Sequence, residues 1–127
     1  MKALIVTFII LNFSLTISAQ NKACIDIKNG NFKYLDSQSN EFIVQRKDSI
    51  QIDSCNSVNF VIHSKINWKS DCEYEMTIYK VNDTLYTPII GKTFEFKIVN
   101  IENDSITLIT KTLNKERKTE RIMQILN

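Results

Sequence analysis

The chain has 127 residues, of which 43% are hydrophobic and 24% are charged, and its formal net charge is +2. This length fits one domain with a modest hydrophobic core and leaves no room for a second domain. A net charge so close to zero produces no field that would steer the protein toward nucleic acid or an anionic membrane. The composition therefore predicts no nucleic-acid partner.

Residues 1–19 have the organisation of a signal peptide. A basic start, Met-Lys, precedes an apolar run over residues 3–11, and Ala19 is a small residue that suits cleavage before Gln20. We expect export to the periplasm, the cell surface or the extracellular medium, and a single β domain at residues 20–127.

Two other fates of the N-terminal segment are alternatives to cleavage. A retained membrane anchor would need roughly twenty apolar residues, which is more than this run supplies. Attachment of a lipid to Cys24 would need an apolar residue three positions earlier, where Asn21 stands. Cleavage fits the sequence better than either, so we predict no stable membrane span in the mature chain.

Three cysteines remain after the leader, and at most two of them can pair within the chain. Of the three pairings we favour Cys24 with Cys72, because it would pin the N-terminal segment to the start of a strand in an oxidising compartment. Its closed loop of about fifty residues would stabilise the fold by ~4 kcal/mol. Cys55 is expected in a hairpin turn and is left as a thiol outside the bridge.

The alternation of apolar and polar residues from residue 30 onward indicates β-strands, because side chains on a strand alternate between its two faces. We predict an all-β antiparallel meander of seven to eight strands, closed as a small lipocalin-like barrel or folded as a two-sheet sandwich. The strands are marked by Phe32 and Tyr34; Phe42 and Val44; Ile50 and Ile52; Val58 through Trp68; Tyr74, Met76 and Ile78; Phe94, Phe96 and Ile98; Ile106 and Leu108; and Ile122 and Leu126.

All of these apolar residues have even numbers, and they stay on one face only if every hairpin loop has an odd length. We therefore expect three-residue turns at residues 47–49 and 69–71. The pairs that follow are Arg46 with Ile50, Val44 with Ile52, Trp68 with Cys72, Ile66 with Tyr74, Ile62 with Ile78, Lys65 with Glu75, His63 with Thr77, and Ile98 with Leu108.

An Asp-Ser or Asp-Thr pair followed by an apolar residue occurs three times, at residues 48–50, 83–85 and 104–106. Such side chains hydrogen-bond the backbone of their own turn, so three turn exits are the simpler interpretation. The alternative is glycosylation at Asp48-Ser49, Asp83-Thr84 or Asp104-Ser105, by an O-linked signal or, at the latter two, as an N-linked sequon.

Residues 82–92 form the longest predicted connection and contain both Pro88 and Gly91. Leu85, Tyr86, Ile89 and Ile90 make it apolar. We expect it to fold back over one end of the sheet, with a lid or a contact patch as the alternative.

Catalytic groups are sparse. His63 is the only histidine, so neither a catalytic triad nor a histidine-rich metal site can be assembled around it. Asp71, Glu73 and Glu75 share one face and could serve a glycosidase, but a surface ion pair with Lys65 explains them more simply. An envelope hydrolase is thus an alternative, and a redox role for Cys55 is another.

Six aromatic residues at even positions could line a barrel that holds an apolar ligand, and core packing explains them equally well. They are Phe32, Tyr34, Phe60, Trp68, Phe94 and Phe96. A group of basic residues near the C-terminus favours a solvated face over an anion site. It comprises Lys111, Lys115, Arg117, Lys118 and Arg121.

The stretch from Cys24 to Tyr74 carries Gly-Asn-Phe-Lys-Tyr at 30–34, Arg46, Ile-Asn-Trp at 66–68 and Asp-Cys-Glu-Tyr at 71–74. In this combination it resembles a group of small exported β-rich proteins of Gram-negative, Bacteroidota-type bacteria. Some members carry the label "DNA topoisomerase IV", which a nearly neutral chain without an acidic metal cluster does not support. The resemblance implies that Cys24 and Cys72 occur together, and it brings no mechanism with it.

Together these features predict an exported β domain that is not an enzyme. We expect it to bind an apolar small molecule inside the barrel, or an envelope protein through residues 82–92. No cofactor or metal is expected.

Overall fold

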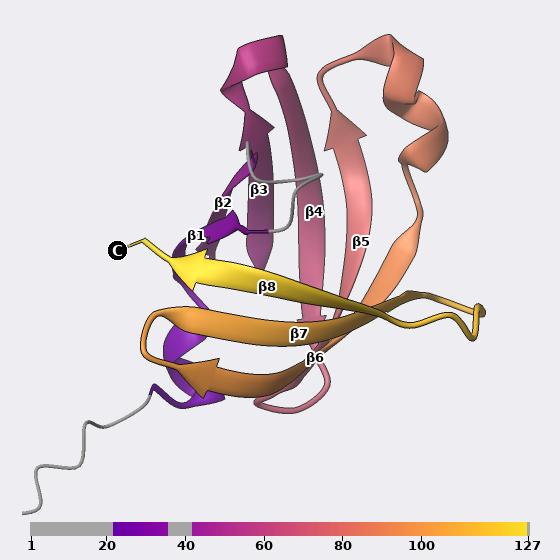
Figure 1. The fold of residues 1–127 in the computed structure, drawn as a ribbon. Coiled ribbons are helices and arrows are strands. Elements are labelled where there is room, and N and C mark those ends of the chain that lie inside the picture. The colour runs from indigo at the N-terminus through magenta and orange to yellow at the C-terminus, as the bar shows by residue number, and fades with distance from the viewer. Residues whose placement is uncertain (1–21, 36–41, 127) are drawn as a thin grey trace, which may run out of the picture.

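The computed structural model describes residues 22–35 and 42–126, so the predicted signal peptide lies outside the described residues. Eight antiparallel strands form a closed barrel in which each strand pairs with the next and the last pairs with the first (Figure 1). Of the two predicted architectures, the barrel is confirmed. The strands are β1 (Gly30–Tyr34), β2 (Phe42–Lys47), β3 (Ile50–Cys55), β4 (Phe60–Trp68), β5 (Glu73–Val81), β6 (Thr93–Glu102), β7 (Ser105–Thr112) and β8 (Thr119–Ile125).

The barrel has two unlike ends. At one, which we call the closed end, the 3₁₀ helix η1 (Cys24–Ile27) lies beside the short turns that join β2 to β3, β4 to β5 and β6 to β7. At the other, the open end, the connections include η2 (Asn56–Val58), η3 (Thr84–Ile89) and residues 113–118. In Figure 1 strands β2–β5 run upright and β6–β8 cross them steeply. No helix in the described part of the chain is long and apolar enough to cross a membrane.

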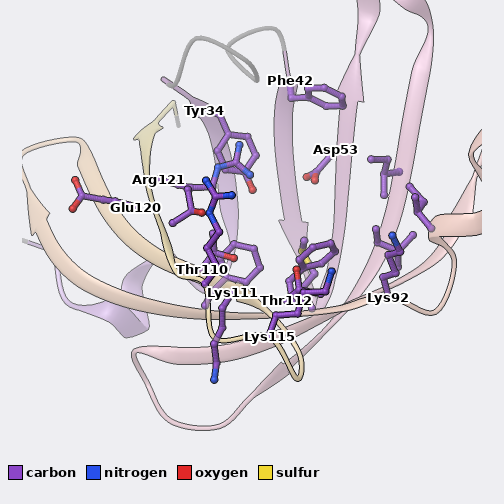
Figure 2. A pocket seen from close by; sticks show the side chains of 18 residues that line it. Tyr34, Phe42, Asp53, Lys92, Thr110, Lys111, Thr112, Lys115, Glu120 and Arg121 are labelled. Carbon is purple, nitrogen blue, oxygen red and sulfur yellow. The ribbon is translucent and has the colours of Figure 1, made fainter.

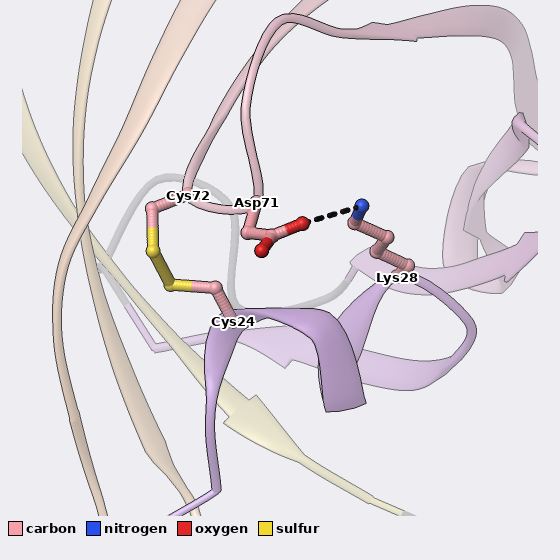
Figure 3. Close-up of polar contacts among 4 residues, drawn as sticks. All are labelled: Cys24, Lys28, Asp71 and Cys72. Atoms are coloured by element: carbon pink, nitrogen blue, oxygen red, sulfur yellow. Dashed lines mark hydrogen bonds and ion pairs between the residues drawn. A yellow bond between two sulfur atoms is a disulfide. The ribbon is translucent and has the colours of Figure 1, made fainter.

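Burial of η1 closes one end of the barrel. Ile27 is 1% exposed and belongs to the hydrophobic core together with residues from the strands. The predicted disulfide between Cys24 and Cys72 is confirmed, with the two Cα atoms 5.2 Å apart, and it ties η1 to the turn before β5 (Figure 3). This bridge indicates a non-cytoplasmic setting, because disulfides persist in oxidising compartments.

The β2–β3 turn is shorter than predicted. Asp48 and Ser49 form a two-residue turn with φ of 52° and 65°, and Arg46 lies opposite Gln51 instead of Ile50. A turn with two positive φ values matches the right-handed twist of the flanking strands. Because its length is even, the odd residues of β3 face inward, so the prediction that Ile52 shares the inner face with Val44 is wrong.

The β4–β5 register is displaced by two residues from the prediction. Trp68 lies opposite Tyr74, and Lys65 lies opposite Thr77 rather than Glu75. The predicted pairs Trp68 with Cys72, Ile66 with Tyr74, Ile62 with Ile78, Lys65 with Glu75, and His63 with Thr77 are therefore wrong. A bulge at Tyr79 also shifts the far part of β5, so that His63 lies opposite Lys80. Even residues of β5 still face the core, since the turn remains odd in length.

The last two hairpins differ in outcome. Ile98 does lie opposite Leu108 as predicted, although through a two-residue turn and a compensating bulge at Val99. In β8 the parity is opposite to the prediction, because Leu108 pairs with Arg121. Met123 and Ile125 are buried while the predicted core residues Ile122 and Leu126 are exposed.

Candidate functional site

A cavity of about 820 Å³ occupies the open end of the barrel, which is within the range of roughly 300–1,000 Å³ typical of small-molecule sites. Its walls come from the last residues of β1, β3, β5 and β7 and the first residues of β2, β4, β6 and β8 (Figure 2). The side chains that line it are Tyr34, Phe42, Asp53, Ile62, Met76, Ile78, Ile89, Lys92, Phe94, Phe96, Thr110, Lys111, Thr112, Lys115, Arg117, Thr119, Glu120 and Arg121.

The deeper walls of the cavity are mainly apolar. Met76, Ile78 and Phe96 are buried and come from adjacent strands β5 and β6. The ring of Phe96 stacks on that of Tyr74, with centroids 4.8 Å apart and planes 9° apart, which fixes this wall against the barrel core. The ladder between β5 and β6 ends at the pair of Thr77 and Thr93, and Ile78 still forms backbone hydrogen bonds with Gly91 and Lys92. The apolar wall of the cavity lies at this end of the ladder, next to the connection that contains η3.

Asp53 is the one buried carboxylate that faces the cavity among the described residues, and it is only 8% exposed. Its Oδ1 accepts a hydrogen bond of 2.8 Å from Gln51 Nε2. Burial raises the pKa of Asp53 to about 6, because desolvation disfavours the charged form more than Gln51, Arg46 and Arg121 favour it. The inner wall therefore presents a hydrogen-bond acceptor that is mostly ionised at neutral pH.

The Asp53 carboxylate is the last member of a buried polar chain that starts at the closed end. Arg46, which is 3% exposed, donates from Nε to Gln51 Oε1 at 2.8 Å and from Nη2 to the Tyr74 hydroxyl at 2.6 Å. A third guanidinium contact reaches the carbonyl of Ile27 in η1 at 3.3 Å. Burial of Tyr74 raises its pKa, so the phenol stays neutral beside this cation.

The rings of Phe32, Trp68 and Tyr74 surround the Arg46 guanidinium, with its Cζ 5.1, 5.9 and 4.7 Å from their centroids. Aromatic faces attract a cation most strongly where water is excluded. Within the described residues no carboxylate forms an ion pair with Arg46, so π faces and hydrogen bonds hold it, and the neutral Gln51 links it to Asp53.

Arg121 enters the barrel because β8 has its odd residues inside. Its guanidinium Cζ lies 4.0 Å from the centroid of the Tyr34 ring, on the cavity wall near Asp53 (Figure 2). Burial raises the pKa of Tyr34, so this ring presents a neutral hydroxyl and a π face. Arg121 and Asp53 thus offset each other's charge within the cavity.

The mouth of the cavity is rich in positive charge. Lys92, Lys115 and Arg117 are exposed and line it, whereas Lys111 Nζ is held by Glu95 Oε2 at 3.0 Å. We call the first three the cationic rim. Of the C-terminal basic residues singled out in the sequence, the structure gathers four in the cavity lining and leaves Lys118 outside it.

The six aromatic residues predicted to line a ligand site separate into three groups. Tyr34, Phe94 and Phe96 line the cavity. Phe32 and Trp68 instead surround Arg46 toward the closed end. Phe60 lies at the open end, where its ring packs on Tyr86 with centroids 4.4 Å apart and on Phe42 at 6.2 Å.

The acidic residues considered for hydrolysis lie apart from the cavity and form ion pairs. Asp71 Oδ1 is 3.1 Å from Lys28 Nζ beside the disulfide (Figure 3). Glu73 pairs with Lys97 at 3.9 Å. Glu75 pairs with Lys69 at 3.6 Å, instead of the predicted Lys65. Within residues 22–35 and 42–126, no group of three histidine, cysteine or acidic side chains is placed to hold a metal ion.

The remaining candidate residues have structural settings. His63 packs its ring edge-on against Tyr79 at 6.0 Å and does not line the cavity. Cys55 is buried at the end of β3, with Sγ 3.3 Å from Ser57 Oγ, so its predicted place in a hairpin turn is wrong.

The predicted long connection at residues 82–92 contains η3, which begins where Asp83 Oδ1 accepts from the backbone N–H of Leu85 at 2.9 Å. Leu85 is 82% exposed, and Tyr86 and Ile90 are also exposed, while Ile89 turns into the cavity. Asp83 caps η3 as predicted, whereas the motifs at residues 48–50 and 104–106 lie in two-residue turns, and glycosylation of any of the three stays a prediction.

Sequence reasoning missed Asp53 and Arg121 as cavity residues. Both lie in strands whose preceding loop has an even number of residues, which reverses the predicted facing. Comparisons with protein-family models, with curated proteins and with solved structures found no match to this chain.

Proposed function

We propose that this protein binds an apolar small molecule in the cavity at the open end of the barrel. The observation that carries the proposal is the cavity of about 820 Å³, walled by Met76, Ile78, Phe94 and Phe96 and bounded at its mouth by polar side chains. Apolar concave sites with a few placed polar groups are the usual form of small-molecule binding sites.

We also propose that the protein acts outside the cytoplasm, after removal of residues 1–19. The signal-peptide organisation of the sequence supports this, and so does the Cys24–Cys72 disulfide. A setting outside the cytoplasm agrees with the resemblance to small exported Bacteroidota-type proteins. That resemblance is itself a prediction from the sequence.

A matched pair of variants tests ligand binding. Ile62→Trp would place a large ring in the cavity, whereas Ile52→Trp would place the same ring at a half-buried position of β3 that does not line it. With 1-aminoanthracene as a neutral fluorescent probe, we expect the unmodified protein and Ile52→Trp to bind alike and Ile62→Trp to bind at least about tenfold more weakly, because the added ring occupies the probe's volume. Circular dichroism would establish that both variants fold. Absence of probe binding, or equal binding by both variants, contradicts the proposal.

A second candidate function is binding of an envelope protein through residues 82–92. The exposure of Leu85 at 82% favours it, because so large an exposed apolar side chain beside Tyr86 and Ile90 is typical of contact surfaces. A photo-crosslinking residue at Leu85 should then capture one defined partner in the producing cells, and the same residue at Val99 on the barrel wall should not. Equal labelling from both positions would contradict this second function.

A further inference from the structure

We infer that the ligand is an amphiphile with one negatively charged end group, whose apolar part fills the cavity while the charged end lies at the cationic rim. This inference rests on the proposed function and deepens it. It is drawn from the distribution of charge between the mouth and the inner wall of the cavity.

Among the described residues, more cations than carboxylates line the cavity. Lys92, Lys115 and Arg117 come from the start of β6 and from the β7–β8 connection, and within the described ranges no carboxylate lies within ion-pair distance of them. Among the described residues, Glu120 is the one acidic side chain that lines the mouth, and Figure 2 shows it turned away from the cavity. Three cations that line one apolar opening favour an anionic group there, since field lines concentrate in a concave site with low-dielectric walls.

The inner wall sets the orientation of the ligand. Asp53 lies there, and its Oδ1 is 2.8 Å from Gln51 Nε2, so this wall already holds a carboxylate. An anionic end group placed deep in the cavity would be repelled by it, and Arg121 is already shared between Asp53 and the Tyr34 ring. The favourable arrangement is head outward, with the apolar chain against Met76 and Phe96.

Three probes of equal chain length separate the contributions of charge and apolar burial. Dodecanoate, dodecan-1-ol and dodecylammonium would each displace 1-aminoanthracene from the protein. We expect dodecanoate to bind about tenfold more tightly than dodecan-1-ol at low salt. Each exposed ion pair contributes little by itself, but the rim offers three cations whose contributions add. The preference should shrink as the ionic strength rises toward about 1 M, where the screening length is only about 3 Å.

Two triple variants with the same change in net charge supply the control. Lys92→Gln/Lys115→Gln/Arg117→Gln removes the rim, and Lys33→Gln/Lys47→Gln/Lys65→Gln removes three cations that do not line the cavity. We expect the first variant to bind dodecanoate and dodecan-1-ol with equal affinity. The second variant should keep the preference for dodecanoate.

The outcomes distinguish a failure of the proposed small-molecule binding from a failure of the inferred preference for an anionic end group. If 1-aminoanthracene and all three amphiphiles fail to bind, the proposed function is overturned together with this inference. If the probe binds but dodecan-1-ol binds as tightly as dodecanoate, only the inference is overturned. Tightest binding of dodecylammonium would likewise overturn it and would identify Asp53 as the group that selects the ligand. Equal loss of preference in both triple variants would show that net charge, and not the rim, is responsible.

Discussion

The closed and open ends of this barrel are built from the same eight strands but differ in how their interiors are filled. At the closed end, η1, the disulfide and the Arg46 chain of hydrogen bonds fill the interior. At the open end the connections are longer, and apolar and cationic side chains line a cavity that meets solvent. The difference indicates that one end supplies stability and leaves the other available for binding.

Asp53 lies where the two regions meet. Through Gln51 it is linked to Arg46 and the closed end, and its carboxylate also faces the cavity. Buried polar networks of this kind rigidify a core when every member is satisfied. We therefore expect substitutions between Asp53 and the closed end to change stability. Substitutions between Asp53 and the open end should change binding.

The largest effect should come from the bridge at the closed end. Replacing Cys24 and Cys72 by serine removes a link across 48 residues, and the loop-entropy model gives a loss of about 4 kcal/mol in the free energy of unfolding. Guanidinium chloride denaturation of the oxidised protein and the double variant would measure it. A difference below about 1 kcal/mol would show that η1 is held by packing alone.

Arg46→Met should cost about 3 kcal/mol, because the methionine fills part of the space but leaves Gln51, the Tyr74 hydroxyl and the Ile27 carbonyl without their donor. Arg117→Met at the cationic rim is the matched control and should change stability by less than about 0.5 kcal/mol. Urea denaturation would compare the two. Similar losses in both variants would contradict the division of the molecule into a stabilising and a binding end.

The pH dependence of the free energy of unfolding should report the raised pKa of Asp53. Its pKa is about 6 in the folded protein against an ordinary value of 3.8, so the folded state holds the proton more tightly. The contribution of Asp53 to stability is therefore greatest below pH 3.8 and falls as the pH rises to about 6, by up to about 3 kcal/mol.

Asp53→Asn isolates this effect, because the amide oxygen can still accept from Gln51 but does not ionise. The stability of the variant relative to the unmodified protein should rise between pH 4 and about 6 and stay constant above it. Thermal unfolding at a series of pH values would follow the difference. A difference that does not depend on pH would mean that the Asp53 carboxyl titrates normally.

The smallest effect on stability should come from the cationic rim. Lys92, Lys115 and Arg117 are exposed, so their joint replacement by glutamine should change the free energy of unfolding by less than about 0.5 kcal/mol. Denaturation of the variant in urea would check it. A loss comparable to that of Arg46→Met would show that these side chains support the barrel.

The alternation of apolar residues was sufficient to predict the strands and the barrel as one of two architectures. The disulfide was predicted from the positions of the cysteines relative to those strands. It was not sufficient to predict which face of β3 and β8 turns inward. Ile122 and Leu126 are as apolar as Met123 and Ile125, so either parity of β8 satisfies the pattern. The turn at Asp48-Ser49 has no glycine to signal its two positive φ values.

These two ambiguities hid the candidate site, because Asp53 and Arg121 face inward only through loops of even length. Enumerating even as well as odd loops would have placed both inside. The cavity itself depends on side-chain volume and on the long connection between β5 and β6, neither of which follows from sequence periodicity. Arg46, by contrast, has the parity of the core and was part of the motif that the family resemblance rests on.

The most direct test of the account is a methyl NMR titration of the labelled protein with dodecanoate. We predict saturable shifts in the methyl signals of Met76 and Ile78 in the cavity wall, with the signals of Ile27 and Ile106 at the closed end unchanged. Shifts confined to exposed Leu85, shifts of Ile27, or no shifts at all would contradict the claim that the open end of the barrel is the binding site.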